Sequence, residues 1–278
     1  MKHLYEERLG TAPMWSLIFK MALPAVAAQF VNLLYSIVDR IYIGHIPHIG
    51  TNALAGIGVA SSVIILISSF SAIVGGGGAP LAAIALGQGD RERAGRFLGN
   101  GCSLLILFTL ITSSLSYLFM QPILSFAGAS PQTIGYASDY LSVYLLGTLF
   151  VELSVGLNTF INTQGRPSIA MWSVIIGAIL NILLDPLFIF TFNMGVKGAA
   201  LATIISQACS AIWIISFLTS SRASLRLEAA YMKPDRRILA SMLALGISPF
   251  IMASTESMIG FVLNGSLKIY GDIYISAL

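Results

Sequence analysis

Seven long apolar runs dominate the sequence and limit what the chain can fold into. They fall near residues 15–43, 52–86, 97–120, 137–163, 169–192, 196–219 and 238–264. Each is long enough to cross a bilayer as a helix, which takes about 20 residues. Charged residues make up only 10% of the 278-residue chain, against about 25% in soluble domains. The sequence therefore predicts an all-α, polytopic membrane protein built as a helical bundle.

The second run contains four consecutive glycines at 75–78, followed by Pro80. We expect the helix either to bend there or to continue in a partly broken form. A glycine run can also bind phosphate, but no Lys-Ser/Thr follows this one and no strand precedes it, which argues against a P-loop. Tight packing against a neighbouring helix is the favoured role.

Positive charges gather on alternate loops, which predicts the orientation in the membrane. With the N-terminus inside, the outer loops hold only Lys197 and Lys268, and Arg40 lies near the outer end of the first run. The inner segments then hold Lys2, Arg8, Lys20, Arg91, Arg93, Arg96, Arg166, Arg222, Arg226, Lys233, Arg236 and Arg237. We expect a multi-pass protein of the inner (plasma) membrane with a cytoplasmic N-terminus. The polar residues 1–13 are expected at the membrane surface.

A weak internal repeat appears when the chain is shifted by 225 residues. Pro24 then falls on Pro249 and Asp39 on Asn264, and each pair lies in an apolar run that follows a basic stretch. Parallel repeats of this kind occur in transporters, with the site between the halves. The interpretation is a six-helix N-lobe at 1–219, a cytoplasmic connector at 220–237 and the start of a second lobe at 238–278. The chain is then expected to be a fragment that lacks helices 8–12.

Four carboxylates lie inside the apolar runs: Asp39, Glu152, Asp185 and Glu256. A carboxylate at that depth costs about 2.5–3.5 kcal/mol on insertion scales, so a partner, a water-filled cavity, a cation or a proton must offset it. Asn181 and Asp185 are four residues apart and share one helix face. Pro186 removes one helix hydrogen bond beside the carboxylate. Glu256 is a candidate substrate contact, while Glu152 either faces a cavity or is neutral.

Oxygen-bearing side chains at similar depth indicate the kind of ion that such a site would take. Asp39, Asp185 and Thr203 fall in the outer half of the membrane, and Asn158 lies deeper. Their oxygen atoms suit Na⁺ or an exchangeable proton, whereas zinc or iron would want His or Cys. Two neighbouring carboxylates also favour the retention of one proton. The sequence predicts a proton or cation site without any other cofactor or metal.

Structural roles are open for the same residues. Asp185 can be a neutral, protonated side chain that bonds to a neighbouring helix. Asp39 and Arg40 can form a charge pair at the membrane edge. Asn158 and Thr203 can make ordinary interhelical hydrogen bonds.

Short motifs in order along the chain resemble those of the multidrug and toxic compound extrusion (MATE) transporters. They are Ala-Leu-Pro at 22–24, Asp39 with Gly44 after it, Asn-Ala-Leu-Ala-Gly at 52–56, Gly75–Gly78, Gln-Gly-Arg-Pro at 164–167, Asn-Ile-Leu-Leu-Asp-Pro at 181–186 and Gly-Val-Lys-Gly-Ala-Ala-Leu-Ala-Thr at 195–203. The family's fold has twelve helices in two six-helix lobes around a central cleft. The resemblance implies a complete N-lobe plus the first helix of the C-lobe.

The same resemblance implies roles for individual residues. It assigns the N-lobe cation site to Asp39, Asn158, Asn181, Asp185 and Thr203. It makes Pro24 the proline at which the first helix bends. One departure is Asn162, which stands where the family often has a basic residue before the turn between the fourth and fifth helices, and which leaves that turn's charge to Arg166.

The activity implied is secondary active export of organic, often cationic, compounds in exchange for H⁺ or Na⁺. The alternative is a flippase for lipid-linked oligosaccharides, which would need a cationic cavity. Only two basic residues, Arg40 and Lys20, lie near an apolar run, so we disfavour the flippase. An enzyme is not indicated, because the runs hold no His-Glu-x-x-His, no Gly-x-Gly-Asp and no Ser-His pair. The expected partners are lipid and small organic molecules, not nucleic acid, and the full-length protein is expected to be a monomer.

Overall fold

The computed structural model describes residues 14–276. The polar segment at 1–13, which was expected at the membrane surface, lies outside the described residues. The described residues form helices and no strand. The long helices are α2 (Met14–Gly44), α3 (Gly50–Ile73), α5 (Arg91–Leu118), α7 (Ile134–Thr163), α8 (Pro167–Pro186), α9 (Val196–Thr219) and α10 (Arg236–Leu267). The shorter elements are η1 (Val74–Gly78), α4 (Ala79–Gly87), α6 (Met120–Phe126), η2 (Leu187–Thr191), η3 (Ala229–Met232) and α11 (Asp272–Ser276).

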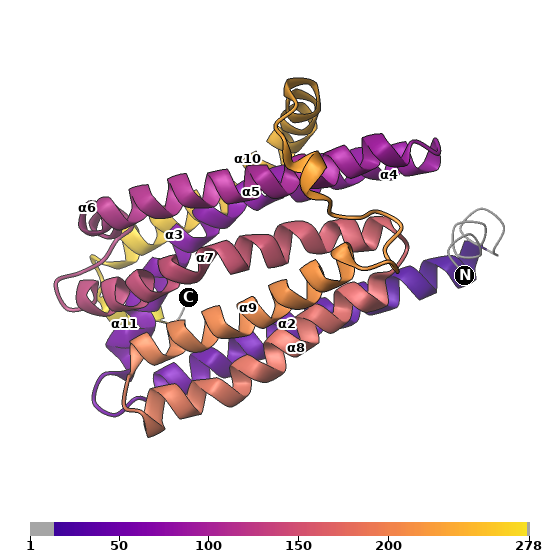
Figure 1. The fold of residues 1–278 in the computed structure, drawn as a ribbon. Helices are drawn as coiled ribbons and strands as arrows, with labels where there is room; N and C mark the ends of the chain where they lie inside the picture. The colour runs from indigo at the N-terminus through magenta and orange to yellow at the C-terminus, as the bar shows by residue number, and fades with distance from the viewer. Residues whose placement is uncertain (1–13, 277–278) are drawn as a thin grey trace.

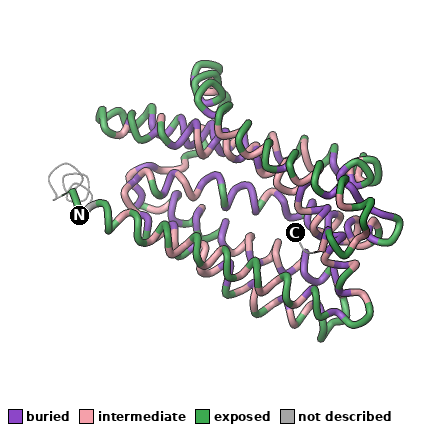
Figure 2. Tube along the Cα trace, turned by 180° about the vertical axis from the view of Figure 1, so that it is seen from behind, coloured by how far each residue is buried: buried purple, intermediate pink, exposed green. Residues whose placement is uncertain are grey.

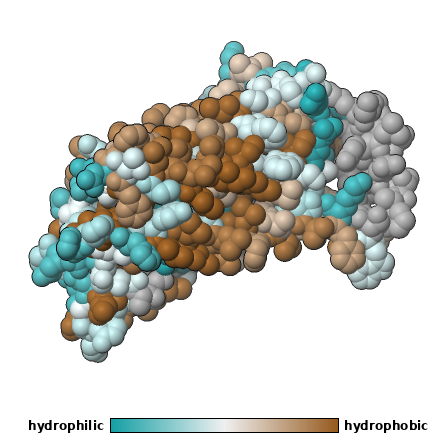
Figure 3. Space-filling model, turned by 90° about the horizontal axis from the view of Figure 1, so that it is seen from below, coloured by the Kyte–Doolittle hydropathy of each residue, from teal (hydrophilic) through white to brown (hydrophobic). Residues whose placement is uncertain are grey.

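Seven segments of the described chain are long and apolar enough to cross a membrane, which confirms the predicted fold class. The largest difference from the predicted runs is at the third, which begins at Arg91 rather than near residue 97. It starts early because the Asp90 side chain caps the helix and accepts a hydrogen bond from the Arg93 amide over 2.9 Å. Figure 3 shows an apolar band across the middle of one face, between more hydrophilic ends.

Helix α7 lies at the centre of the bundle. In Figure 1 it runs between a layer that contains α3, α4 and α5 and a layer that contains α2, α8 and α9. Its side chains Leu141, Leu157, Phe160 and Ile161 are fully buried. The outer helices bury only their inward faces (Figure 2), and they leave large apolar side chains exposed. Apolar side chains on the outer surface are expected where lipid, not water, surrounds the bundle.

The glycine run does not break the second spanning segment. The chain continues from α3 to α4 through η1, a single turn of π-helix. A Cβ atom on Gly77 would overlap the backbone carbonyl of Met242 on α10, and one on Gly246 would lie 2.5 Å from the Ile73 carbonyl oxygen. The glycines therefore let α10 approach this turn closely, as the favoured interpretation predicted.

The connector between α9 and α10 is attached to the bundle by two amide side chains. Asn100 on α5 donates from Nδ2 to the Tyr231 carbonyl over 3.1 Å and accepts from the Asp235 amide over 2.7 Å. Gln164 Oε1 accepts hydrogen bonds from the backbone amides of Ser224 and Leu225 over 2.9 and 3.0 Å. The sequence predicted a connector here but not these attachments. Division of the chain into lobes remains a prediction.

Candidate functional site

Helices α2 and α8 pack side by side (Figure 1), and they bring Asp39 and Asp185 into direct contact. Asp185 is fully buried and Asp39 is half-buried. Two ionised carboxylates cannot share such a place without strong repulsion, so the contact calls for a proton or a cation between them. The predicted approach of these two residues is observed, and their binding of an ion remains a prediction.

The end of α8 shapes the surroundings of Asp185. Pro186 carries no backbone N–H, so it cannot donate to the carbonyl four residues earlier. The helix then widens into the π-turn η2. Turns of this kind inside helices are frequent at functional sites, because they change the direction in which side chains and carbonyls point.

Asn181 links Asp185 to a third helix. Its Nδ2 atom lies 3.3 Å from Asp185 Oδ1 and 3.5 Å from Thr203 Oγ1 on α9. Thr203 in turn donates to the Ala199 carbonyl over 3.0 Å. Asn181, Asp185 and Thr203 are therefore brought together, as the sequence predicted. Because Thr203 donates its proton to its own helix, its oxygen faces Asn181 as an acceptor.

Three oxygen atoms of this cluster are buried without a hydrogen-bond donor among the described residues. They are Asp39 Oδ1, Asn181 Oδ1 and Asp185 Oδ2. Buried acceptors are nearly always paired in native proteins, and leaving one unpaired costs about 1–3 kcal/mol. Three such oxygens together match the oxygen ligands that a small hard cation takes, or the acceptors that a proton with water takes.

Two tyrosines that sequence reasoning overlooked lie beside the cluster. Tyr35 is close enough to interact electrostatically with both Asp39 and Asp185, and Tyr140 interacts with Asp39 and lies next to Thr203. Tyr35 precedes Asp39 by four residues, so the spacing on α2 could have revealed it. Tyr140 lies on α7, and no pattern in the sequence links it to α2.

Asn158 does not join the cluster. It donates from Nδ2 to the Ala170 carbonyl over 3.1 Å and to Ser173 Oγ over 2.8 Å, both on α8. Ser173 is eight residues from Asn181, which is about 12 Å along a helix. The structure therefore shows Asn158 linking α7 and α8 through interhelical hydrogen bonds, which is the structural role considered for it from the sequence. Among the described residues, no contact between Asn158 and the Asp39, Asn181 and Asp185 side chains supports its predicted part in ion binding.

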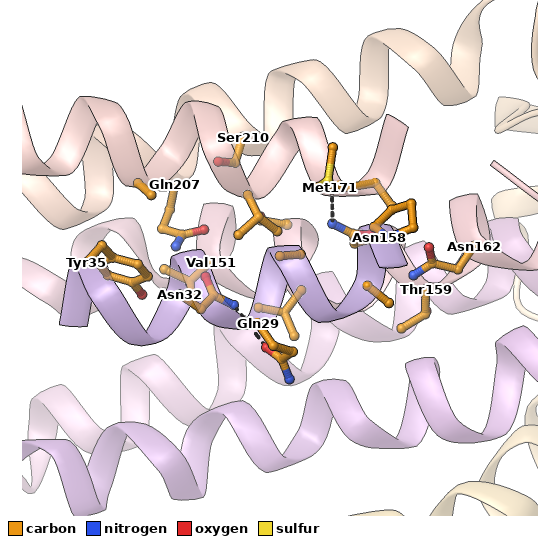
Figure 4. Close-up of a pocket in the computed structure, with 18 of the residues that line it drawn as sticks. Gln29, Asn32, Tyr35, Val151, Asn158, Thr159, Asn162, Met171, Gln207 and Ser210 are labelled. Atoms are coloured by element: carbon orange, nitrogen blue, oxygen red, sulfur yellow. Dashed lines mark hydrogen bonds between the residues drawn. The ribbon is translucent and has the colours of Figure 1, made fainter. Parts of the chain in front are cut away.

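A cavity of about 410 Å³ lies between α2, α7, α8 and α9 (Figure 4). It reaches from Pro24, Asn158 and Asn162 at one end to Tyr35 and Thr203 near the cluster. Its remaining polar lining is formed mainly by uncharged side chains, including Gln29, Asn32, Gln207 and Ser210. No charged side chain lines it among the described residues. The cavity offers many hydrogen bonds and apolar contacts but no fixed charge.

The other predicted positions lie apart from the cluster. Pro24 is inside α2, which continues through it as one helix. Arg166, at the turn before α8, stacks its guanidinium over the Phe217 ring at 5.7 Å. Glu256 is exposed on α10, which packs mainly against α3 and η1. Glu152 is buried between α7 and α3, where Ser68 donates to it over 2.8 Å.

Comparison with known proteins gives consistent results. The family model described as MatE matches residues 24–187. Multidrug export protein MepA of Staphylococcus haemolyticus (strain JCSC1435) is 27% identical over 266 residues, which cover 94% of this chain and 58% of the relative. The MepA protein of Staphylococcus aureus (strain MSSA476) is 27% identical over 271 residues, covering 96% of this chain and 58% of the relative.

A solved structure of the MATE multidrug transporter DinF-BH in complex with rhodamine 6G has a similar fold. It is 32% identical, superposes with a TM-score of 0.91, and the match covers 98% of this chain and 60% of that chain. The chain therefore spans about three fifths of the length of the relatives that it matches. Together with the seven spanning segments, these likenesses establish a multi-pass membrane protein.

Proposed function

Because the chain belongs to the MatE family of transporters, we propose that it forms the ion-binding part of a multidrug efflux transporter. In this proposal the protein exports organic compounds in exchange for H⁺ or Na⁺. The relatives' descriptions as multidrug transporters support the export function. The observation that carries the ion exchange is the group of three donorless oxygens on Asp39, Asn181 and Asp185.

The ion would act by holding two helices in one arrangement. Asp39 is on α2 and Asp185 is on α8, so a proton or cation between them links the helices, and its loss leaves two charges that repel. An ion can shift a conformational equilibrium only if it binds one state better than the other. The cluster meets that requirement, because moving α2 away from α8 would divide the binding oxygens.

The substrate would enter the cavity beside this cluster. Its lining of amides, hydroxyls and apolar side chains suits molecules that combine an apolar body with a few polar groups. The lack of charged side chains there does not fix the charge of the substrate. Asp39 and Asp185, which lie beside the lining residue Tyr35, can add negative potential when no ion is bound, which would favour organic cations.

The proposed setting is the plasma membrane, with the N-terminus on the cytoplasmic side. Basic residues in the first turns of α5 and along the connector support this orientation, while Lys197 lies at the opposite end of the bundle. The lipid-linked oligosaccharide flippase is not favoured, because the cavity has no cationic lining among the described residues.

The test is gradient-driven efflux of rhodamine 6G, the ligand named for the DinF-BH structure. Cells that express the gene encoding this chain should export the dye faster when an inward H⁺ or Na⁺ gradient is imposed. Comparing the two gradients in proteoliposomes identifies the coupling ion. Dye export that ignores both gradients would contradict the proposed exchange.

A further inference from the structure

A second acidic site lies between α7 and α3, separate from the Asp39–Asp185 pair. Glu152 is near the middle of α7 and is only 2% exposed. It does not line the cavity, although its neighbours Val151 and Ser154 do. Its carboxyl group therefore points to the other side of α7, into the interface with α3.

The polar groups around Glu152 do not match a charged carboxylate. Ser68 Oγ donates to Oε1 over 2.8 Å, while Oε2 is buried without a hydrogen-bond partner among the described residues. The Ser71 hydroxyl is next to the carboxyl group but donates its proton to the Ser68 carbonyl over 2.7 Å. A charged Oε2 thus finds no donor, whereas a protonated Oε2 can donate to the Ser71 oxygen after a small movement.

No basic residue neutralises Glu152 in the elements packed around it. The described sequences of α3 and η1 hold no charged residue, and the spanning part of α5 from residue 97 holds none either. On α7 itself, Tyr144 is the titratable group that interacts with Glu152 electrostatically. A buried carboxylate without a cationic partner is costly in a bilayer, so uptake of a proton is the least costly way to hold this side chain.

We propose that Glu152, Ser68 and Ser71 form a proton-binding site that is independent of the Asp39–Asp185 pair. The reaction is the addition of one proton to Oε2, which converts the carboxylate to a carboxylic acid, and its return to water. The proposal does not depend on efflux activity, nor on the nature of the ion held by Asp39 and Asp185.

The position of this site indicates what its proton would influence. Ser69, next to Ser68, accepts a hydrogen bond from Ser254 of α10 over 3.1 Å. The π-turn η1 begins one turn further along α3, where the glycines meet α10. A carboxylate at Glu152 would draw donors toward itself and disturb the α3 segment that carries these contacts. The proton therefore stabilises the packing of α3 against α10.

The experiment is infrared difference spectroscopy on the purified chain in lipid, with the pH varied. It follows the carbonyl stretch that only a protonated carboxyl group gives. A variant with both Asp39→Asn and Asp185→Asn should retain one titrating carboxyl band from an apolar environment. Adding Glu152→Gln should remove that band, while adding the matched control Glu92→Gln, an exposed carboxylate on α5, should leave it.

A second measurement uses the unmodified chain and needs no variant to fold. Dicyclohexylcarbodiimide reacts with protonated carboxyl groups in apolar surroundings, and mass spectrometry locates the adduct. Glu152 should be labelled at low pH and protected at high pH. The proposal is wrong if Glu152 stays protonated or stays charged over the whole pH range, or if the band in the double variant survives Glu152→Gln.

Discussion

Asn181 donates a hydrogen bond from Nδ2 to Oδ1 of Asp185 over 3.3 Å, while its own Oδ1 and the other oxygen of Asp185 are buried without a donor. The amide therefore orients the carboxylate without satisfying it. Asp39 adds a third donorless oxygen from α2.

Asn181 and Asn158 should affect ion dependence differently. Replacing Asn181 by Leu removes one site oxygen and the donor that orients Asp185. The ion concentration for half-maximal efflux should rise about tenfold, the equivalent of about 1.4 kcal/mol. Asn158→Leu removes only a bond between α7 and α8 and should leave this concentration nearly unchanged. Equal shifts in the two variants would show that Asn158 belongs to the site after all.

Gly77 should tolerate no side chain. A Cβ there meets the Met242 carbonyl of α10, so Gly77→Ala should destabilise the bundle by about 1–3 kcal/mol through overpacking. The control is Gly87→Ala, where a Cβ meets nothing within 4 Å. Alanine at that helical position should be neutral or slightly stabilising. The free energy of unfolding in mixed detergent micelles measures both, and equal stability of the variants would argue against the close approach.

Asn100 should hold the connector in place. Asn100→Ala leaves the Tyr231 carbonyl and the Asp235 amide without their partner, which costs about 1–3 kcal/mol per buried unpaired group. Trypsin should then cut faster at the basic residues of the connector. The exposed Gln121→Ala is the control and should leave the cutting rate unchanged. Unchanged cutting in Asn100→Ala would mean that other contacts hold the segment.

Single cysteines should report the orientation. In a background with Cys102 and Cys209 replaced by Ser, Gln88→Cys should react with an impermeant thiol reagent only from the cytoplasmic side. Lys197→Cys, at the other end of the bundle and 51% exposed, should react only from outside. Both positions are accessible, so low reactivity cannot be mistaken for burial. The reverse pattern would contradict the orientation derived from the Lys and Arg distribution.

The sequence predicted those parts of the structure that follow from local patterns. Run length sets the seven spanning segments, and the four-residue spacing puts Asn181 and Asp185 on one face. The approach of Asp39 followed from the cost of isolated buried charges. Tyr140 could not be placed in this way, because its contact with Thr203 depends on how α7 packs against α9.

Other features depend on geometry that no sequence pattern carries. The resemblance assigned both Asn158 and Asn181 to the cation site, yet the Asn158 side chain bonds to the Ala170 carbonyl, two turns or more away from the cluster. The attachment of the connector by Asn100 and Gln164 joins residues that are 60 or more positions apart. Glu152 could not be interpreted until α3 was seen to place Ser68 and Ser71 beside it.

The most direct test of the central claim is ion-driven efflux by Asp185→Asn in the protein expressed from the gene that encodes this chain. Asn keeps the size of the side chain but cannot exchange a proton and cannot balance the charge of a cation. Membrane insertion of the variant should not suffer, since replacing a carboxylate by an amide lowers the free-energy cost of placing this side chain in the bilayer. The matched control is Asp139→Asn, a half-exposed carboxylate that pairs with Lys197. We predict that Asp185→Asn abolishes gradient-dependent rhodamine 6G efflux at normal membrane levels while the control retains it. Unchanged efflux by Asp185→Asn would show that this residue only joins helices.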